Sequence, residues 1–478
     1  MTEKVLNALR EVVGEKNLLA GSDDRRAYDN DVIGKHEGHS WAVAQPATTT
    51  EVSEILKLAH LHGIPVVPQG GNTGLAGGAS PGAGANQIIL SLARMNKITE
   101  INADTRIARV EAGVVLEKLH NAAAEHDLIF PLFFGARGSC MIGGNLSTNA
   151  GGSNVLRYGN TRALVLGVEV VLADGRVLNL MSELLKDNTG YDLKDLFIGA
   201  EGTLGVITGA VLKLFPRPSA YATAYLAMGN MADALSLLRS LQDLTGNAVE
   251  AFEYMPAGYF KDYVKKYPDC RAPLENPDKV NILVEVGASS ALLARPDSSG
   301  RAAVHGVLEE TLAKLVEEGK ISDAVVAQTD AQRLAFWHCR ESAFELSTMY
   351  GPMIDHDISV PLGKVDTFLR EMRRRLPEIA PEARDCVIAH LGDGNLHYSV
   401  VPAENHDGID PALAENVTSL VEDVIAELNG SFSAEHGIGL SKRPSMARRK
   451  DRPALDVMKE IKHALDPKNI MNPGKVLP

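Results

Sequence analysis

Three glycine-rich stretches in the first 215 residues are the feature that most restricts how this chain can fold. They cover residues 70–78, 143–152 and 199–205, and the first follows the short apolar run 64–68. Glycine lets the backbone approach a ligand closely and turn its N–H groups toward anionic oxygens. One such stretch is usually an ordinary loop, but three in one region favour a fold that wraps a long phosphate-bearing ligand, such as a dinucleotide.

The better-known short motifs for phosphate binding are absent from the sequence. No G-x-G-x-x-G opens a helix, so the Rossmann fingerprint is missing, and no G-x-x-x-x-G-K-[ST] is present, which argues against a P-loop NTPase. The glycine stretches therefore indicate another kind of nucleotide-binding fold.

Composition limits the class of protein further. A chain of 478 residues is too long for one hydrophobic core, which predicts two or three domains. The net charge of −13 disfavours nucleic acid as a partner, because phosphate binding needs a basic surface. No run approaches the roughly 18 apolar residues of a membrane span. The cysteines are scattered, which is typical of a reduced, cytoplasmic protein.

Local patterns predict both helices and strands. Thr48 and Glu51 form a capping-box pattern at the start of a helix over residues 49–61, and Gly63 ends that helix. Residues 164–180 have the pattern of a β-hairpin. The first part of the chain is therefore expected to mix helices, strands and glycine loops.

From about residue 216, glycine becomes rarer and helical patterns alternate with extended segments. We expect helices at 234–244 and 302–318, with strands at 281–286 and 386–389. The expected division of the chain is residues 1–215, then 216–425, then a C-terminal segment 426–478.

A second notable feature is the run from His390 to His397, centred on Asp393-Gly394. This dipeptide favours a two-residue type I′ turn, which needs positive φ at both positions. Such a turn would pair Leu391 with Leu396 and His390 with His397, and opposed side chains lie about 5 Å apart. Two imidazoles placed in this way could share a metal ion. Downstream, Glu435-His436 offers a carboxylate ligand and a base.

These motifs resemble those of a known family. Residues 68–74, 143–152 and 199–205 resemble the FAD-binding segments of the vanillyl-alcohol oxidase/p-cresol methylhydroxylase superfamily. Within it, residues 390–397, 435–437 and 472–475 resemble the FAD-dependent D-2-hydroxyacid dehydrogenase branch, which includes D-lactate and D-2-hydroxyglutarate dehydrogenases. The likeness covers nearly the whole chain. It implies an α+β fold, in which a two-part FAD-binding domain of vanillyl-alcohol-oxidase type carries an inserted α/β substrate (cap) domain.

The resemblance also implies which residues hold the cofactor. Some relatives bind FAD covalently through a histidine in the first glycine stretch, but Asn72 stands near that place here and the loop has no histidine. We therefore expect non-covalent FAD. The implied cofactor-binding residues are Pro68, Gly70, Gly71, Asn72, Thr73, Gly74, Leu75, Ser139, Gly143, Gly144, Asn145, Thr148, Asn149, Gly151, Glu201, Gly202, Gly205, Ile207 and Asn472.

For the chemistry, the resemblance implies that His390, His397 and Glu435 bind a divalent metal. Zinc suits imidazole and carboxylate ligands, although manganese or iron would also fit. A metal lowers the pKa of a hydroxyl bound to it by several units. His436 would then take the hydroxyl proton, or would instead act as a metal ligand or bind the substrate by a hydrogen bond.

Three residues are expected to contact substrate. Arg340 matches the position of a carboxylate-binding arginine in relatives, although it could instead pair with Glu341 or lie at the surface. Asn395 is a second candidate, or simply a turn residue, and Ser399 is the third. Relatives that use 2-hydroxyglutarate have asparagine in place of Ser399, and many have lysine in place of Asp355. These departures place a dicarboxylate substrate in doubt and leave D-lactate or a longer monocarboxylate.

The expected activity is oxidation of a D-2-hydroxy acid, such as D-lactate or D-2-hydroxyglutarate, by hydride transfer to flavin. Electrons would pass to a separate acceptor such as an electron-transfer flavoprotein, a quinone or a cytochrome. The family suggests a homodimer. Two alternatives stay open, namely a flavoprotein like alkylglycerone-phosphate synthase and a flavin- or metal-binding protein without catalysis.

Overall fold

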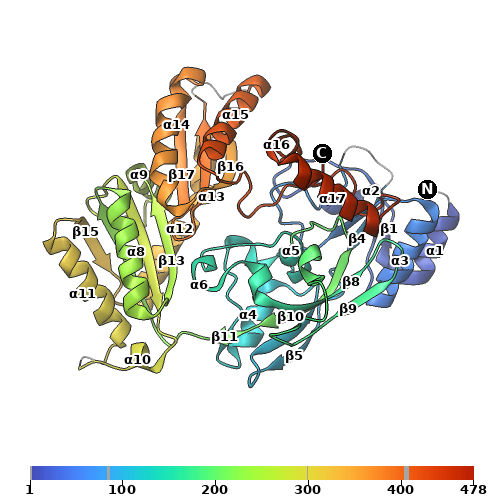
Figure 1. Ribbon diagram of the computed structural model, residues 1–478, viewed down its shortest axis with the longest axis horizontal. Coiled ribbons are helices and arrows are strands. Elements are labelled where there is room, and N and C mark those ends of the chain that lie inside the picture. The colour runs from blue at the N-terminus through green and yellow to red at the C-terminus, as the bar shows by residue number, and fades with distance from the viewer. Residues whose placement is uncertain (1–2, 83–86, 299, 403–407) are drawn as a thin grey trace. The chain divides into compact units, whose positions relative to one another are not determined.

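The computed structural model describes residues 3–82, 87–298, 300–402 and 408–478, and it divides into two compact units (Figure 1). The first unit comprises Met1–Gly151, Gly159–Pro216 and Glu435–Pro478. The second comprises Gly152–Tyr158 and Arg217–Ala434. The second unit is therefore inserted into the sequence of the first, with the short segment 152–158 as a separate contribution.

Two main sheets form the first unit. The smaller has the order β1-β2-β4-β3, and β4 runs parallel to both β2 and β3. The larger is antiparallel, with the order β5-β6-β10-β8-β9, and β7 pairs with β11 separately. The strands are β1 Leu18–Leu19, β2 Ser40–Ala44, β3 Val66–Gln69, β4 Gln87–Ser91, β5 Ile98–Asn102, β6 Ile107–Glu111, β7 Leu128–Ile129, β8 Val165–Val171, β9 Val177–Leu180, β10 Val206–Lys213 and β11 Phe215–Pro216.

Helix α3, Thr49–His62, shows how local sequence sets an element of this unit. The side chain of Thr48 accepts a hydrogen bond from Glu51 N–H, and Gly63 ends the helix with a φ of 62°. The predicted helix is confirmed, as is the β8–β9 hairpin. The other helices are α1 Glu3–Val13, α2 Ser22–Asp29, α4 Leu116–Ala124, α5 Ile142–Ser147, α7 Lys194–Phe197, α16 Arg443–Arg449 and α17 Arg452–Leu465.

A seven-stranded sheet organises the second unit, in the order β15-β12-β14-β13-β17-β18-β16. Helices and strands alternate along the sequence as expected, and the strands pair antiparallel throughout. The strands are β12 Tyr221–Met228, β13 Val249–Met255, β14 Val280–Gly287, β15 Ile321–Val326, β16 Ile354–Ser359, β17 Arg384–His390 and β18 Asn395–Val401.

The two faces of this sheet differ. One face packs against α8, α11, α14 and α15 and forms a large apolar core with them (Figure 1). The other face packs against α9, α12 and α13 and forms a smaller apolar core. The helices are α6 Val155–Tyr158, α8 Met231–Thr245, α9 Ala257–Lys266, α10 Ala291–Ala294, α11 Ala303–Glu317, α12 Asp330–Glu341, α13 Ala343–Ser347, α14 Val365–Ile379 and α15 Pro411–Glu427. In the described part of the chain, no helix has the length and apolarity needed to cross a membrane.

The predicted hairpin between His390 and His397 exists as β17 and β18, but its predicted register is wrong. His390 is opposed to Asn395, and His397 is opposed to Ile388. Leu396 likewise pairs with Ala389 and not with Leu391. Since side chains alternate between faces with a period of two, a shift by two residues still leaves both histidines on the same face.

The turn explains the difference in register. Gly394 has a φ of 82°, whereas Asp393 does not have the positive φ that a type I′ turn requires. The N–H groups of Asp393 and Gly394 both lie 3.2 Å from the carbonyl oxygen of His390. Four residues, 391–394, therefore connect the strands in place of two.

Candidate active site and cofactor loops

In the first unit, the glycine stretches come together. A Cβ atom added at Gly71 would lie 2.1 Å from the carbonyl oxygen of Ser139, so only glycine allows the first stretch to lie against the residues just before the second. The third stretch joins the second through a hydrogen bond of 2.8 Å from Glu201 N–H to the carbonyl oxygen of Ser147. Segments more than 50 residues apart thus form one set of loops.

The C-terminal tail joins the first and third stretches. Nδ2 of Asn472 donates to the carbonyl oxygens of Gly78, at 2.9 Å, and Glu201, at 2.7 Å. Its Oδ1 is buried and has no hydrogen-bond partner among the described residues, while a Cβ atom at Gly74 or Gly144 would meet nothing within 4 Å. A buried acceptor and free space beside the loops fit FAD, which offers hydroxyl and ring N–H donors.

The carboxylate of Glu201, an expected cofactor residue, binds backbone. It accepts hydrogen bonds from Ile438 N–H at 2.7 Å and Gly439 N–H at 2.8 Å. Burial raises the pKa of Glu201, and these two donors oppose that effect only in part. Glu201 therefore holds the loop that directly follows Glu435 and His436, whose Oε1 and Nε2 atoms lie 3.6 Å apart.

Other expected cofactor residues also make local contacts. Asn149 Oδ1 accepts from Arg162 N–H at 2.8 Å, and Thr148 Oγ1 donates to the carbonyl oxygen of Gly144 at 3.2 Å. A Cβ atom at Gly143 would lie 2.7 Å from Cβ of Ala112, which indicates a packing role. The remaining expected residues lie in or beside the same stretches: Pro68, Gly70, Asn72, Thr73, Leu75, Asn145, Gly151, Gly202, Gly205 and Ile207.

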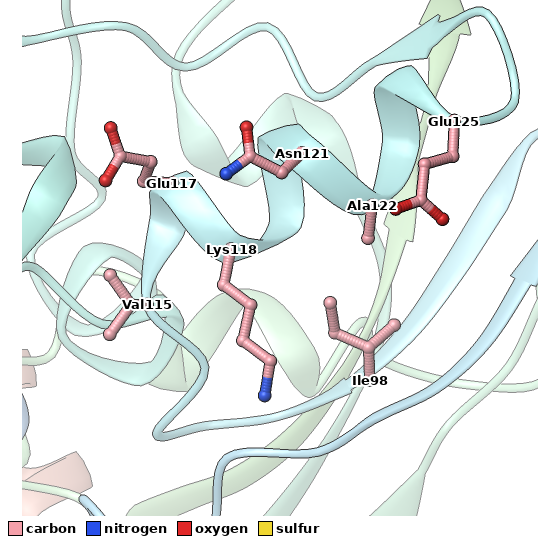
Figure 2. Close-up of a pocket in the computed structure, with 7 residues that line it drawn as sticks. All are labelled: Ile98, Val115, Glu117, Lys118, Asn121, Ala122 and Glu125. Atoms are coloured by element: carbon pink, nitrogen blue, oxygen red, sulfur yellow. The ribbon is translucent and has the colours of Figure 1, made fainter.

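Figure 2 shows a pocket elsewhere in the first unit, beside α4. It is lined by Ile98, Val115, Glu117, Lys118, Asn121, Ala122 and Glu125. Nζ of Lys118 donates to the carbonyl oxygen of Asn96 at 2.8 Å. None of the expected site residues lines this pocket, and its charged side chains of both signs come from one helix, so it shows no catalytic arrangement.

In the second unit, three side chains form a buried chain of polar contacts. Nδ1 of His390, at the end of β17, lies 2.9 Å from the carboxylate of Glu253 on β13. Nε of Arg340, on α12, donates to Oε2 of this carboxylate at 2.8 Å, and Nη2 lies 2.6 Å from the same oxygen. The side chains of Glu253 and Arg340 are 1% and 9% exposed. Such a buried group is held rigidly because each charge has its partner.

The charge state of this chain follows from its contacts. Burial alone would raise the pKa of Glu253, but His390 and Arg340 outweigh burial and hold that pKa below its usual value. An ionised carboxylate can only accept hydrogen bonds, so Nδ1 of His390 carries the proton. In a neutral imidazole this places the lone pair on Nε2, the tautomer that a metal-binding histidine needs.

His397 and Asp357 form the next part of the same sheet face. They are directly opposed on β18 and β16, and each offers a ligand atom within 4.8 Å of the other. The rings of His390 and His397 lie at 79° with centroids 5.4 Å apart. Asp357 accepts from Asn395 Nδ2 at 3.0 Å and from Ala434 N–H at 3.2 Å. Asn395 is thus engaged in holding this carboxylate.

Asp355 and Ser399, the two residues that differ from those of the relatives described above, are partners in the structure. Asp355 and Ser399 are directly opposed, and Ser399 Oγ donates to Asp355 Oδ1 at 2.7 Å. Each lies two residues from Asp357 or His397 on the same strand, so all four side chains share one face. An acidic residue therefore stands on the face that carries the candidate metal ligands.

Two of these residues were not among those expected from the sequence. Glu253 lies in a strand with no motif, and no local signal could have found it. Asp357 could have been found, because it alternates with Asp355 in an extended segment and therefore shares a face with it. The expected Glu435 and His436 belong to the first unit, directly after Ala434.

Comparison with known proteins identifies the family. Residues 41–181 match the FAD binding domain model, and residues 217–476 match the model of FAD linked oxidases, C-terminal domain. The mitochondrial D-2-hydroxyglutarate dehydrogenase of Bos taurus is 37% identical, over 100% of this chain and 84% of that protein. The chain belongs to the FAD-linked oxidases of the D-2-hydroxyacid dehydrogenase branch. It is an FAD-linked oxidoreductase that acts on CH–OH donors.

Further members of this oxidase family agree with that placement. The D-2-hydroxyglutarate dehydrogenase of Xanthomonas citri pv. viticola is 35% identical, over 100% of this chain and 97% of that protein. In fold, the FAD-linked oxidase is similar to p-cresol methylhydroxylase, with a TM-score of 0.72 and 17% identity over 99% and 96% of the two chains. It also resembles alkyldihydroxyacetonephosphate synthase, with a TM-score of 0.72 and 18% identity over 100% and 86%. The expected fold class is confirmed.

Proposed function

We propose that this FAD-linked oxidase converts a D-2-hydroxy acid with one carboxylate to the 2-oxo acid, with the help of a divalent metal. The observation that carries the proposal is the buried chain from Arg340 through Glu253 to His390, which ends beside His397 and Asp357. When bound, FAD would accept the α-hydrogen as hydride and the metal would lower the pKa of the substrate hydroxyl.

We propose His390, His397 and Glu435 as metal ligands, with Asp357 as a further candidate. The support for His390 is its bond to Glu253, since metal-binding histidines usually donate their other N–H to a carboxylate. The support for Glu435 is its place in the chain. It directly follows Ala434, whose N–H donates a hydrogen bond to Asp357. Zinc suits this set, and manganese or iron would also fit.

We propose His436 as the group that takes the hydroxyl proton. Its ring is next to Glu435 in sequence, and Glu201 holds the backbone that follows it. The substrate carboxylate would be bound by Arg340, because Nη2 carries two protons and only one can face Glu253. We also propose Asn395 and Ser399 as substrate neighbours. Asn395 would act by holding the carboxylate of Asp357.

The preference for one carboxylate rests on Asp355. Its charge lies on the sheet face of the proposed ligands, and a second carboxylate near it would be repelled. Changing Asp355→Lys together with Ser399→Asn should therefore increase kcat/KM for D-2-hydroxyglutarate relative to D-lactate, by about tenfold if one exposed charge contact of about 1.4 kcal/mol is gained. The control is Asp366→Lys, an exposed residue on α14. An equal ratio in both variants would refute the specificity proposal.

The reaction itself can be tested with the purified holoenzyme. D-Lactate should bleach the flavin absorbance without oxygen, the L-enantiomer should not, and a chelator should abolish bleaching until zinc or manganese is added back. The His390→Ala/His397→Ala variant should lose bound metal, whereas His305→Ala on α11 should keep it. If none of the D-2-hydroxy acids bleaches the flavin, the dehydrogenase proposal is refuted and a synthase-like flavoprotein is favoured.

We propose further that electrons leave to an electron-transfer flavoprotein, a quinone or a cytochrome, that the protein is a homodimer, and that it is cytoplasmic. Several relatives carry the word mitochondrial in their names, so the location needs its own test. Rates of reoxidation of the reduced flavin by each acceptor, and sedimentation of the holoenzyme, would examine these points.

A further inference from the structure

Residues 152–158 continue directly from the second glycine stretch but pack within the second unit. They include the single-turn helix α6, Val155–Tyr158. Three of their side chains reach one carboxylate: Glu250 accepts from Asn154 Nδ2 at 2.9 Å, Arg157 Nη1 at 2.5 Å and Tyr158 OH at 3.0 Å. Because the spacing i, i+3, i+4 places these donors on one side of a turn, the whole segment is held at a single point.

Glu250 is built for this contact. The register of β13 shifts between Val249 and Ala251, so Glu250 lies at a β-bulge, which re-aims its side chain out of the regular alternation. Its side chain is only 2% exposed. Arg157 also donates through Nη2 to Ser289 Oγ. A buried carboxylate with three donors keeps its geometry, because loss of any donor leaves part of a charge without a partner.

Leu156, in the same segment, contacts the turn between β17 and β18. A Cβ atom added at Gly392 would lie 2.6 Å from Cδ2 of Leu156, so Leu156 packs directly on the backbone of the turn between β17 and β18. Gly392 N–H also donates to the carbonyl oxygen of Phe252 at 3.1 Å. Within four residues, β13 therefore holds α6 through Glu250, the turn through Phe252, and His390 through Glu253.

We infer that residues 152–158 are a positioning segment for the turn that carries His390 and His397, an inference that rests on the proposed role of these histidines at the metal. The contact with Leu156 sets the distance between the turn and the sheet. The hydrogen bonds from Asn154, Arg157 and Tyr158 to Glu250 hold Leu156 in place. The segment directly follows the second glycine stretch, which is proposed to bind FAD, in the sequence. Leu156 and Glu250 are positioning residues and not catalytic ones.

The test compares Leu156→Ala with Leu315→Ala in the holoenzyme. Both leucines are partly buried against the same hydrophobic core, but Leu315 lies on α11, away from the turn. Zinc is titrated into chelator-treated protein, and kcat and KM for D-lactate are measured. The FAD content of each variant is measured as well. Leu156→Ala should weaken zinc binding and lower kcat by about tenfold, as is typical when support of a metal-binding histidine is lost. FAD content should match the control, and Leu156→Met should restore both values.

A second readout does not need metal or turnover. In protein labelled with ¹³C-histidine, the ring resonances of His390 and His397 should shift in Leu156→Ala and in Glu250→Gln, and stay in place in Leu315→Ala. Unchanged resonances in the first two variants would overturn the inference, as would zinc binding and kcat equal to the control. If the wild-type enzyme binds no zinc and D-lactate does not reduce its flavin, the proposed function fails, while the resonances still decide the positioning role.

Discussion

Glu253 connects two residues of the candidate site, because one carboxylate holds both Arg340 and His390. The Glu253→Gln variant keeps the shape of the side chain but leaves the buried guanidinium without a negative partner. We expect the free energy of unfolding to fall by about 3–5 kcal/mol, measured by urea denaturation. The partly exposed pair Arg301–Glu309 offers a control. Glu309→Gln should cost less than about 1 kcal/mol, and equal losses in the two variants would contradict the prediction.

His120 provides a prediction about pH. Burial lowers its pKa from 6.5 to about 4, and the ring stacks on Phe133 at a centroid distance of 4.5 Å. Between these pH values the unfolded chain binds a proton that the folded protein does not bind. Stability therefore falls as the pH decreases from 6.5 to 4, by up to about 3 kcal/mol.

Urea unfolding at several pH values between 4 and 7 measures this dependence. The His120→Gln variant should be less stable at neutral pH but should show a smaller loss on acidification. The same substitution at exposed His62 is the control. A slope in His120→Gln that equals the wild-type slope would show that other groups cause the acid sensitivity.

At the scale of elements, the turn between β17 and β18 depends on one glycine. Gly394 has a φ of 82°, and a Cβ atom there would lie 2.3 Å from the carbonyl oxygen of Val360. The Gly394→Ala variant should lose at least about 1–3 kcal/mol through backbone strain alone, together with zinc affinity. Gly363→Ala is the control, because a Cβ atom at Gly363 meets nothing within 4 Å. Calorimetry with zinc titration checks both effects, and retained zinc affinity in Gly394→Ala would contradict the expectation.

The sequence predicted elements better than it predicted their pairing. The helix at 49–61 followed from Thr48 and Gly63, both of which act within one turn of the helix. The hairpin at 390–397 was predicted from Asp393-Gly394, but its register was wrong. The observed turn has four residues in place of the predicted two. Two of its glycines lie against residues elsewhere in the second unit, Gly394 against Val360 and Gly392 against Leu156. Register depends on such contacts, which the local pattern does not contain.

At the scale of the molecule, each unit has its own hydrophobic core. Heating should therefore produce more than one transition, since two-state unfolding is expected only of single domains. Added FAD should stabilise the unit that binds it, by about 2.7 kcal/mol at a concentration 100 times Kd. Scanning calorimetry of the flavin-free and FAD-loaded enzyme tests this, with Leu315→Ala in the second unit as a marker for the other transition. One transition that shifts as a whole with FAD would contradict independent unfolding.

The sequence by itself determined the glycine stretches, the helix caps, the strand periods and the proposed site residues other than Glu253 and Asp357, because each of these depends on neighbours in the chain or on a motif. Tertiary structure alone decided how those residues are used. It placed Glu253 between Arg340 and His390, set Asp357 opposite His397, and paired Asp355 with Ser399. These contacts join residues 40 to 137 positions apart. They depend on which strands become neighbours in the sheet, and that follows from burial of the whole core.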